Sequence, residues 1–246
     1  MSHHLITFSD VCFSYPDGTQ VLKGVSFQIH HGEKVALVGA NGAGKSTLIN
    51  LLSGFYQPSS GYIALGDIKV TPATIETVRR TIGFTFQNPD DQLFMPTVFD
   101  DVAFGLVNMG VEGEDLERQV MSALRRVGVE HLAERPPYRL SGGQKRSVAL
   151  AGILVMEPSV LVLDEPSNAL DPQARENLLE QLTAFTHSQL IATHDLDLVL
   201  DICDRVIVLS QGEVLSNATP AETFSNLELL QASSLGLPLK MQGKKI

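Results

Sequence analysis

The sequence of 246 residues predicts an α/β protein, with a mostly parallel sheet flanked by helices. Two observations support this fold class. Apolar segments at 160–164, 190–194 and 205–210 alternate with segments of helical pattern, which is typical of parallel strands covered on both faces. The stretch from about 88 to 156 has helical spacing instead, which predicts a helical subdomain inserted into the α/β core.

The first 70 residues are predicted to form an N-terminal antiparallel β-subdomain. The segments LITFSDVCFSY, VLKGVSFQI and GYIALGD are rich in β-branched and aromatic residues, and the turns PDG, HHG and SSG break them. EKVALVGA is an apolar strand that ends at a glycine-rich loop. The pattern from Lys45 to Leu52 then predicts a helix that Gly54 stops.

The middle of the chain is predicted to be helical. TVFD at Thr97 to Asp100 fits a capping box. Apolar residues recur at helical spacing before Gly128, namely Leu116, Val120, Ala123, Leu124 and Val127. Together these patterns predict one domain over 1–246, in which 1–87 and 157–246 form the α/β core and 88–156 the helical subdomain.

Composition and charge exclude several classes of protein. With 43% hydrophobic and 19% charged residues, the chain reads as globular, and its longest apolar run is far shorter than the ~20 residues of a membrane helix. The start lacks the features of a secretory signal, and the spacing of Cys12 and Cys203 fits neither a metal nor a redox site, so a cytoplasmic location is expected. The net charge of −10 argues against a nucleic-acid partner. The lysine-bearing end, KMQGKKI, is predicted to be a frayed tail.

GANGAGKST satisfies the phosphate-loop pattern G-x-x-x-x-G-K-[ST] with Gly39, Gly44, Lys45 and Ser46. Glycines let successive N–H groups point at phosphate oxygens, and the helix that begins near Lys45 adds its dipole. Lys45 is predicted to reach the β- and γ-phosphates, and the Ser46 hydroxyl to ligate Mg²⁺. The strand before the loop and the helix after it disfavour a plain glycine-rich turn with a surface lysine.

VLVLDE at 160–165 supplies two carboxylates. Asp164 ends a predicted buried strand, where an open α/β sheet presents groups to a ligand, and it can hold the Mg²⁺ shell. Because adjacent residues diverge at a strand end, Glu165 can face a water that attacks the γ-phosphate. Alone, Asp164 would also fit a turn residue at a strand end.

RLSGGQKRS, from Arg139 to Ser147, is a second segment suited to an anion. Ser141 offers a hydroxyl, and Gly142 and Gly143 offer backbone N–H groups at the start of a predicted helix that runs to Met156. A capped helix start with a glycine turn would explain SGG by itself. It would not explain the pairing of this segment with both preceding motifs in this order.

With these motifs the chain resembles the ATP-binding subunit of ABC transporters over nearly its whole length, and LSGGQ resembles the signature of that family. The resemblance implies an ATPase with a P-loop core, whose cofactors are ATP and Mg²⁺. It also implies that two subunits pack head to tail, so that each signature caps the γ-phosphate held by the other subunit's loop. The second anion segment would then be half of a shared site.

The resemblance also assigns roles to single residues. Tyr15 matches the aromatic that stacks on adenine, Gln87 the glutamine that contacts Mg²⁺ and water, and Asp171 the D-loop aspartate at the dimer seam. His194 matches the histidine that contacts the γ-phosphate, and Glu165 is the expected general base. Without the resemblance, Tyr15 would pass for a strand aromatic and His194 for a structural histidine. The full set expected to contact the nucleotide is Tyr15, Gly39, Asn41, Gly42, Gly44, Lys45, Ser46, Thr47, Ser141, Gly142, Gly143, Gln144 and Asp171, with Ser46, Gln87 and Asp164 as metal ligands.

Two positions depart from the family pattern. Related proteins usually carry an arginine at the position of Ser147, whereas here the basic pair is Lys145-Arg146. The sequence leaves open whether Arg146 replaces that contact. Asn168 stands where a small hydroxyl residue or glycine is commoner.

FQNPDDQLFMPTVFDDVAFG, Phe86 to Gly105, resembles the ATPases of energy-coupling-factor importers. Leu93, Phe94 and Met95 beside an acidic pair predict either a groove that receives a helix of a membrane subunit, near Gln87–Phe99, or the core of the helical insertion. The resemblance favours the groove. It implies a transmembrane scaffold subunit, a substrate-binding membrane subunit and a location at the cytoplasmic face of the membrane.

The resulting hypothesis is the ATP-hydrolysing motor of an importer for cobalt or nickel ions, paired with an identical chain. A vitamin importer with a paralogous ATPase partner is the alternative. A soluble ABC ATPase of DNA repair or translation is disfavoured by a single core, only about 50 residues between Gln87 and Leu140, and no CxxC. A scaffold that binds ATP without hydrolysis would be expected to lack Glu165 or His194.

Overall fold

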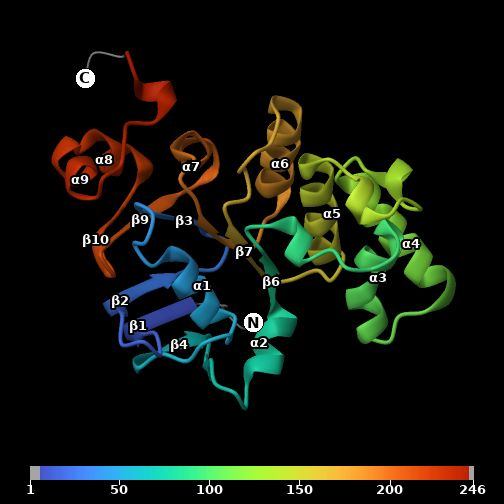
Figure 1. Cartoon of the computed structure of the whole chain (residues 1–246), viewed down its shortest axis with the longest axis horizontal. Helices are drawn as coiled ribbons and strands as arrows, with labels where there is room; N and C mark the ends of the chain where they lie inside the picture. Colours follow the sequence, from blue (N-terminus) through green and yellow to red (C-terminus); the bar gives the residue numbers. More distant parts are fainter. Residues whose placement is uncertain (1–5, 244–246) are drawn as a thin grey trace. The chain divides into compact units, whose positions relative to one another are not determined.

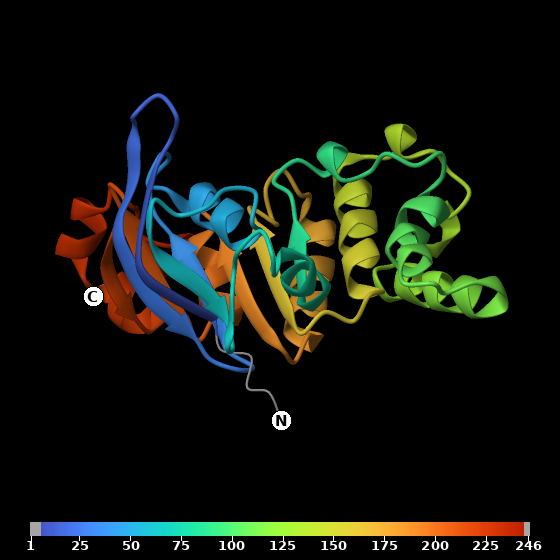
Figure 2. The same ribbon diagram turned by 90° about the horizontal axis from the view of Figure 1, so that it is seen from below.

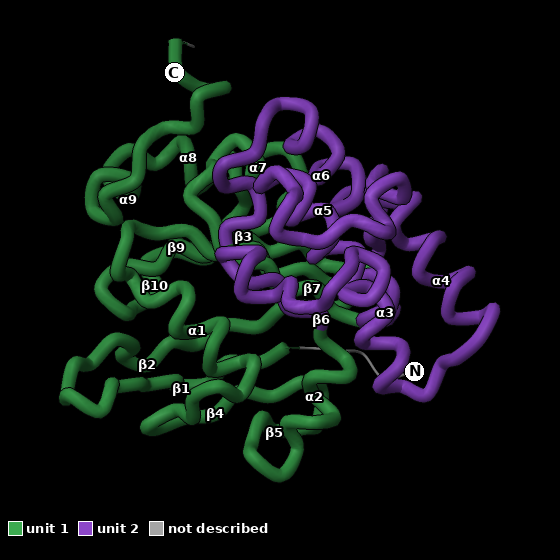
Figure 3. The backbone as a smooth tube through the Cα atoms, turned by 45° about the vertical axis from the view of Figure 1, so that its right-hand side comes forward, with its two compact units in different colours: residues 1–82, 159–164, 187–246 green, residues 83–158, 165–186 purple. Residues whose placement is uncertain are grey.

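The structure, a computed structural model, describes residues 6–243, and Figure 1 labels most of their helices and strands. The chain forms two compact units (Figure 3). The first comprises Met1–Ile82, Ser159–Asp164 and His187–Ile246; the second comprises Gly83–Pro158 and Glu165–Thr186. Residues 1–5 and 244–246, which include the end of the predicted tail, lie outside the described residues.

The first unit contains both sheets of the predicted α/β core. Its strands are β1 (Ile6–Ser14), β2 (Gln20–Ile29), β3 (Lys34–Val38), β4 (Ser60–Leu65), β5 (Ile68–Lys69), β7 (Val160–Asp164), β8 (Ser188–Ala192), β9 (Arg205–Ser210) and β10 (Glu213–Ala218). Its helices are α1 (Lys45–Leu52), α2 (Ile75–Thr81), α7 (Leu196–Ile202), α8 (Pro220–Ser225) and α9 (Leu227–Ala232), with a 3₁₀ turn η4 (Leu239–Met241).

The antiparallel sheet has the strand order β2-β1-β4-β5, which confirms the prediction for the N-terminal segments. β1 pairs antiparallel with β2 and with β4, and Figure 2 shows β1 and β2 as neighbouring strands of one hairpin. Every second residue of β1 is buried at its start, and the rings of Phe8 and Phe27 stack with centroids 4.4 Å apart. This alternation is why the segment forms a strand that buries one face.

The second sheet has the order β10-β9-β3-β8-β7 within the first unit. β9, β3, β8 and β7 are parallel neighbours, and β10 returns antiparallel along β9 after the predicted turn at Gln211-Gly212. All five residues of β7 are buried, as are all five of β8, which is the pattern expected of a parallel sheet covered on both faces. On one face of this sheet, Phe224 and Leu230 pack against Val206 and Val208 of β9.

Arg205 ties four segments of the first unit together. Its Nε donates to Glu33 Oε1 at 2.5 Å and its Nη2 to Glu33 Oε2 at 2.7 Å, while further bonds reach the Gln28 carbonyl and Asn217 Oδ1. The two side chains are only 19% and 17% exposed. Burial by itself would raise the pKa of the Glu33 carboxyl, but the hydrogen bonds from Arg205 and from the His30 N–H lower it below 4.5.

We expect Arg205→Ala to lower the free energy of unfolding at neutral pH by about 2–3 kcal/mol, because a half-buried carboxylate loses its partner. Since the folded-state pKa of Glu33 is depressed, its stabilising contribution is complete above 4.5 and is lost as the pH falls below that value. The effect of Arg205→Ala should therefore shrink in acid. Urea unfolding of the parent and of Arg205→Ala, at neutral pH and in acid, measures the difference in the free energy of unfolding.

Arg80→Ala is the matched control, because Arg80 and Glu76 form an ion pair whose side chains are 78% and 85% exposed. Exposed pairs contribute about 0–1 kcal/mol, so this variant should unfold almost as the parent does. If Arg205→Ala lowers the free energy of unfolding no more than Arg80→Ala does, the pair of Arg205 and Glu33 does not stabilise the unit.

The second unit is mostly helical. It contains β6 (Ile82–Thr85, whose first residue belongs to the other unit), α3 (Val98–Asn108), α4 (Gly113–Arg126), α5 (Gly142–Leu154) and α6 (Pro172–Ala184), with 3₁₀ turns η1 (Pro89–Asp91), η2 (Glu130–Leu132) and η3 (Pro137–Arg139). α3, α4 and α5 pack on one another, and the predicted helix before Gly128 is α4. Residues 165–186 join this unit, although the sequence assigned them to the core.

Candidate functional site

The carboxyl ends of β3, β7 and β8 lie side by side in the first unit. Ala192 of β8 is paired with Leu37 of β3 on one side and with Asp164 of β7 on the other. The N–H of Thr193 donates to the Leu37 carbonyl at 3.2 Å. The glycine loop after β3, Asp164 at the end of β7, and His194 two residues beyond β8 therefore share one edge of the sheet. Open α/β sheets bind their ligands at this edge.

The loop from Gly39 to Gly44 has a backbone that glycine makes possible. Gly42 and Gly44 adopt φ values of 80° and 108°, in the region that residues with a Cβ rarely occupy. At Gly44 a Cβ would also come within 2.7 Å of Leu22 Cδ2. Gly44 is the N-cap of α1, so the backbone N–H groups at the start of this helix face the loop. This geometry suits a phosphate group.

Lys45 supplies a cation inside that loop. Its side chain is buried, and its ammonium donates to the carbonyls of Gly39 at 2.7 Å and Ala40 at 3.3 Å. Asn41, Gly42 and Ser46 are exposed beside it. The predicted phosphate loop is therefore folded around its lysine, with exposed groups next to it.

Tyr15 lies against the same loop, where the sequence alone could not place it. Its hydroxyl is 3.1 Å from the Thr47 hydroxyl, and its half-buried ring makes edge contacts with Phe13 and Tyr56. Thr47 is the last residue of the loop motif and lies in the first turn of α1. The predicted adenine-stacking residue and the predicted phosphate-binding loop are thus neighbours in the first unit.

Ser46 and Asp164 are the two candidates for Mg²⁺ in this unit. The Ser46 hydroxyl is exposed at the start of α1, the Asp164 carboxylate is 7% exposed at the end of β7, and α1 contacts β7. Mg²⁺ prefers oxygen ligands and takes one or two from protein, with phosphate oxygens and water completing the shell. A hydroxyl and a carboxylate beside a phosphate loop fit that requirement.

In the second unit, Arg146 bonds to both Gln87 and Glu165. The sequence indicated Arg146 as part of a basic pair but did not predict its contacts. Arg146 of α5 donates from Nη1 to the Glu165 carbonyl at 2.7 Å and from Nη2 to the Gln87 carbonyl at 3.3 Å. Glu165 is 7% exposed, and its φ of 50° is uncommon for a residue with a side chain. The basic pair Lys145-Arg146 was the signal in the sequence, but spacing cannot identify two carbonyls as partners.

The signature segment forms the start of α5, as predicted. The Ser141 hydroxyl accepts from the Gln144 N–H at 3.3 Å, and the Gln144 side chain accepts from the Ser141 N–H at 3.0 Å, a complete capping box. Gly142 is exposed, and a Cβ there would meet nothing within 4 Å. At Gly143 a Cβ would come within 3.2 Å of Ala174.

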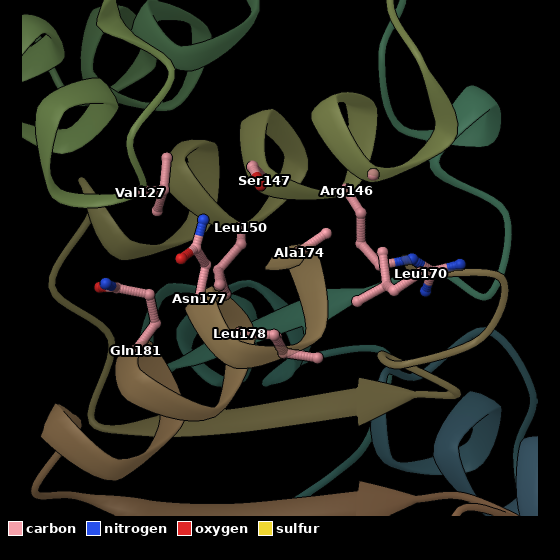
Figure 4. A pocket seen from close by; sticks show the side chains of 10 residues that line it. Val127, Arg146, Ser147, Leu150, Leu170, Ala174, Asn177, Leu178 and Gln181 are labelled. Carbon is pink, nitrogen blue, oxygen red and sulfur yellow. The ribbon is translucent and has the colours of Figure 1, made fainter. Parts of the chain in front are cut away.

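Asp171 caps the neighbouring helix. It is exposed, and its Oδ1 accepts from the Ala174 N–H at 2.8 Å at the start of α6. A cleft between α5 and α6 holds about 290 Å³, counting space open to solvent. Figure 4 shows the Arg146 side chain extending from α5 toward the segment that carries Leu170, while Ser147 and Asn177 line the cleft farther along the helices.

Phe94 and Phe104 of the second unit, which are 65% and 43% exposed, form an apolar surface, here called the Q-loop patch because Phe94 lies in the loop that follows Gln87. The rings of Phe94 and Phe104 meet edge to face, 5.1 Å apart. Asp101 Oδ1 accepts from the N–H groups of Phe94 and Met95, both at 3.0 Å, and thereby fixes the loop. Burial raises the pKa of the Asp101 carboxyl, and those two bonds oppose the rise only in part.

The sequence offered two readings for residues 93–95, groove or core, and the side chains divide between them. Phe94 is exposed, whereas Leu93 and Met95 are half-buried.

Among residues 6–243, no helix combines the length and the apolar character needed to span a bilayer.

The model for the ABC transporter family matches residues 22–168 of this chain. A putative ABC transporter ATP-binding protein of Geobacter sulfurreducens is 54% identical over 243 residues, which cover 99% of this chain and 98% of that protein. An energy-coupling factor transporter ATP-binding protein, EcfA, of Methanocaldococcus jannaschii is 45% identical, covering 96% of this chain and 86% of its own length.

Solved structures of ABC transporter proteins are also similar to this chain. CbiO1 from Clostridium perfringens, described as part of the ABC transporter complex CbiONQ, superposes with a TM-score of 0.82 at 40% identity, covering 93% of this chain and 94% of that one. An ATP-binding cassette, MJ0796, in a dimeric post-hydrolysis state with ADP and phosphate has a TM-score of 0.80 at 28% identity, covering 87% and 98%.

Proposed function

This chain belongs to the ABC transporter family of ATP-binding subunits, and on that premise we propose that it is the ATP-hydrolysing motor of an energy-coupling-factor importer. The observation that carries the proposal is the shared sheet edge of the first unit. There the glycine loop around Lys45, the carboxylate of Asp164 and His194 follow three neighbouring parallel strands. These are the groups that a bound nucleoside triphosphate requires.

In this proposal the loop binds the phosphates of ATP through the backbone N–H groups at the start of α1. Lys45 exchanges its bonds to the loop carbonyls for β- and γ-phosphate oxygens. The same loop contributes Asn41, Gly42, Gly44 and Thr47 to the nucleotide site. Tyr15 stacks on adenine. Ser46, Asp164 and Gln87 would hold Mg²⁺, which would supply charge neutralisation at the phosphates.

Hydrolysis requires one proton transfer. Water attacks the γ-phosphorus, the bond to the β–γ bridging oxygen breaks, and the products are ADP and inorganic phosphate. The Glu165 carboxylate accepts the proton of the attacking water, and His194 donates a hydrogen bond to the γ-phosphate. Asp171 lies at the seam with the second subunit.

The signature acts on the nucleotide of a second chain. Gly142 and Gly143 present backbone N–H groups at the start of a capped helix, which favours an anion. We propose that Ser141, Gly142, Gly143 and Gln144 cap the γ-phosphate held by an identical chain, so that ATP closes the dimer and hydrolysis reopens it.

Mixing two inactive variants tests this shared site. Lys45→Ala removes the cation of the loop, and Gly142→Glu places a negative charge against the γ-phosphate. A Cβ at Gly142 meets nothing within 4 Å, and an acid at a helix start is favourable, so the second variant should fold. Each variant alone should show almost no ATPase activity.

In a mixed dimer one site has an intact loop from one chain and an intact signature from the other. An equal mixture should therefore recover up to about a quarter of the parent activity, as random pairing of an isologous dimer predicts. Activity equal to the sum of the separate variants would mean that the signature does not complete the other chain's site.

The Q-loop patch is proposed to dock a transmembrane scaffold subunit, because exposed aromatic rings next to acidic residues suit an amphipathic helix with basic ends. The scaffold and a substrate-binding membrane subunit would hold the motor at the cytoplasmic face of the membrane. No nucleic acid is expected as a partner.

The transported substrate is proposed to be cobalt or nickel ions, on the resemblance of Phe86–Gly105 to the ATPases of energy-coupling-factor importers. An identical chain is proposed as the ATPase partner, because both halves of the shared site are present in this chain. A vitamin importer with a paralogous ATPase is the alternative. Uptake of radioactive cobalt, nickel and vitamins by the complex reconstituted in vesicles separates these substrates. ATPase activity with no stable membrane partner would favour a soluble member of the family.

A further inference from the structure

Arg146 connects three segments that are far apart in the chain. It lies in the second turn of α5 and bonds the carbonyls of Glu165 and Gln87, which are 19 and 59 positions away. All three residues belong to the second unit. Its planar fork has donors in fixed directions, so one guanidinium can hold two acceptors at a defined spacing.

A hydrogen bond to the Glu165 carbonyl can control the direction of the Glu165 side chain. The backbone of Glu165 has a φ of 50°, so its side chain points in a direction that an ordinary strand would not give. The same carbonyl also accepts from the Asn168 N–H at 3.2 Å, and Pro166 follows directly. Two donors therefore fix the peptide unit that orients the Glu165 carboxylate.

The half-buried setting keeps this arrangement rigid. The Arg146 side chain is only partly exposed to solvent. Hydrogen bonds from a charged donor are roughly twice as strong as neutral ones. Lys145, the neighbour on the same helix, pairs instead with Asp90 at 2.5 Å, so Arg146 is the member of the basic pair that faces both carbonyls.

We propose that Arg146 is a positioning residue for ATP hydrolysis: its two hydrogen bonds hold the main chain of Glu165 and Gln87 so that their side chains meet the attacking water. This inference rests on the proposed roles of those two residues.

A double-mutant cycle of four proteins tests the inference: the parent, Arg146→Met, Glu165→Gln and the double variant. Methionine keeps the aliphatic stem and removes the donors, so packing is preserved while the two bonds are lost. We expect Arg146→Met to lower kcat about 10–100-fold with the KM for ATP nearly unchanged, since small misplacements of catalytic groups cost about that much. Arg146→Lys, with one compact donor group, should recover part of the loss.

In the Glu165→Gln background, Arg146→Met should lower the residual single-turnover rate by a smaller factor than it does in the parent, because the part of its effect that acts through the Glu165 carboxylate is already lost and residues that act as a unit are non-additive. An equal loss in both backgrounds, or full activity of Arg146→Met, would overturn the inference. Glu165→Gln at the parent rate would instead refute the proposed role of Glu165, which this design detects separately.

Arg125→Met in α4 is the control, because Arg125 forms an exposed ion pair with Glu130 and touches neither carbonyl. It should keep the parent kcat and KM. The melting temperatures of all variants are measured alongside. A loss of kcat in Arg146→Met that is matched by a lowered melting temperature and a changed KM would mean that Arg146 serves the fold and not the reaction.

Discussion

Lys45→Ala should bind ATP about 10–100-fold more weakly than the parent, because it loses a charge-assisted contact to phosphate that is worth about 1.5–3 kcal/mol. Its kcat should fall by a further factor of about 10²–10³, since the same cation opposes charge that develops in the transition state. The loop should keep its left-handed glycines, although it loses the two bonds from the Lys45 ammonium to the carbonyls of Gly39 and Ala40. Equilibrium binding of a fluorescent ATP analogue and steady-state hydrolysis measure the two losses separately.

Lys23→Ala is the matched control, since Lys23 is an exposed lysine of β2 in the same unit. It should bind and hydrolyse ATP as the parent does. Should Lys45→Ala retain parent affinity, the phosphates would bind elsewhere and the sheet-edge site would be wrong.

Glu165→Gln should hydrolyse ATP about 10²–10⁴-fold more slowly while binding it normally, because glutamine keeps the shape of the side chain but cannot accept the proton of water. ATP would then persist in the shared site. Mass in solution, measured with and without Mg-ATP, should therefore change from that of a monomer to that of a dimer. This variant separates nucleotide-driven closure from hydrolysis.

Glu176→Gln, an exposed residue of α6 in the same unit, should leave both the rate and the mass unchanged. Glu165→Gln that binds ATP yet stays monomeric would mean that the complementary signature comes from another protein, and the search would turn to a paralogous ATPase. Rapid hydrolysis by Glu165→Gln would exclude Glu165 as the base.

Much of the fold follows from local pattern. The buried strands β3, β7 and β8 were predicted because residues covered on both faces must be apolar, and the loop motif places Lys45 after such a strand. Since parallel strands carry their carboxyl ends to one edge, the neighbourhood of Asp164 and His194 also follows from the sequence once the strand order is known.

Contacts between distant segments could not be predicted in the same way. The bond between Tyr15 and Thr47, and the two bonds of Arg146, depend on register and on side-chain direction, which hydrophobic spacing does not encode. The grouping of residues 165–186 with the helical unit reflects the packing of α6 on α5. A pattern that alternates strands and helices gives no indication of which neighbour a helix prefers.

The capping box of α5 has a consequence for how fast two chains can join. Ser141 and Gln144 already bond each other's N–H groups within the chain, so the helix end does not need a nucleotide to become ordered. A surface that is rigid before the encounter loses little conformational entropy on association. Its association rate then depends mainly on diffusion and orientation and does not wait for a folding step.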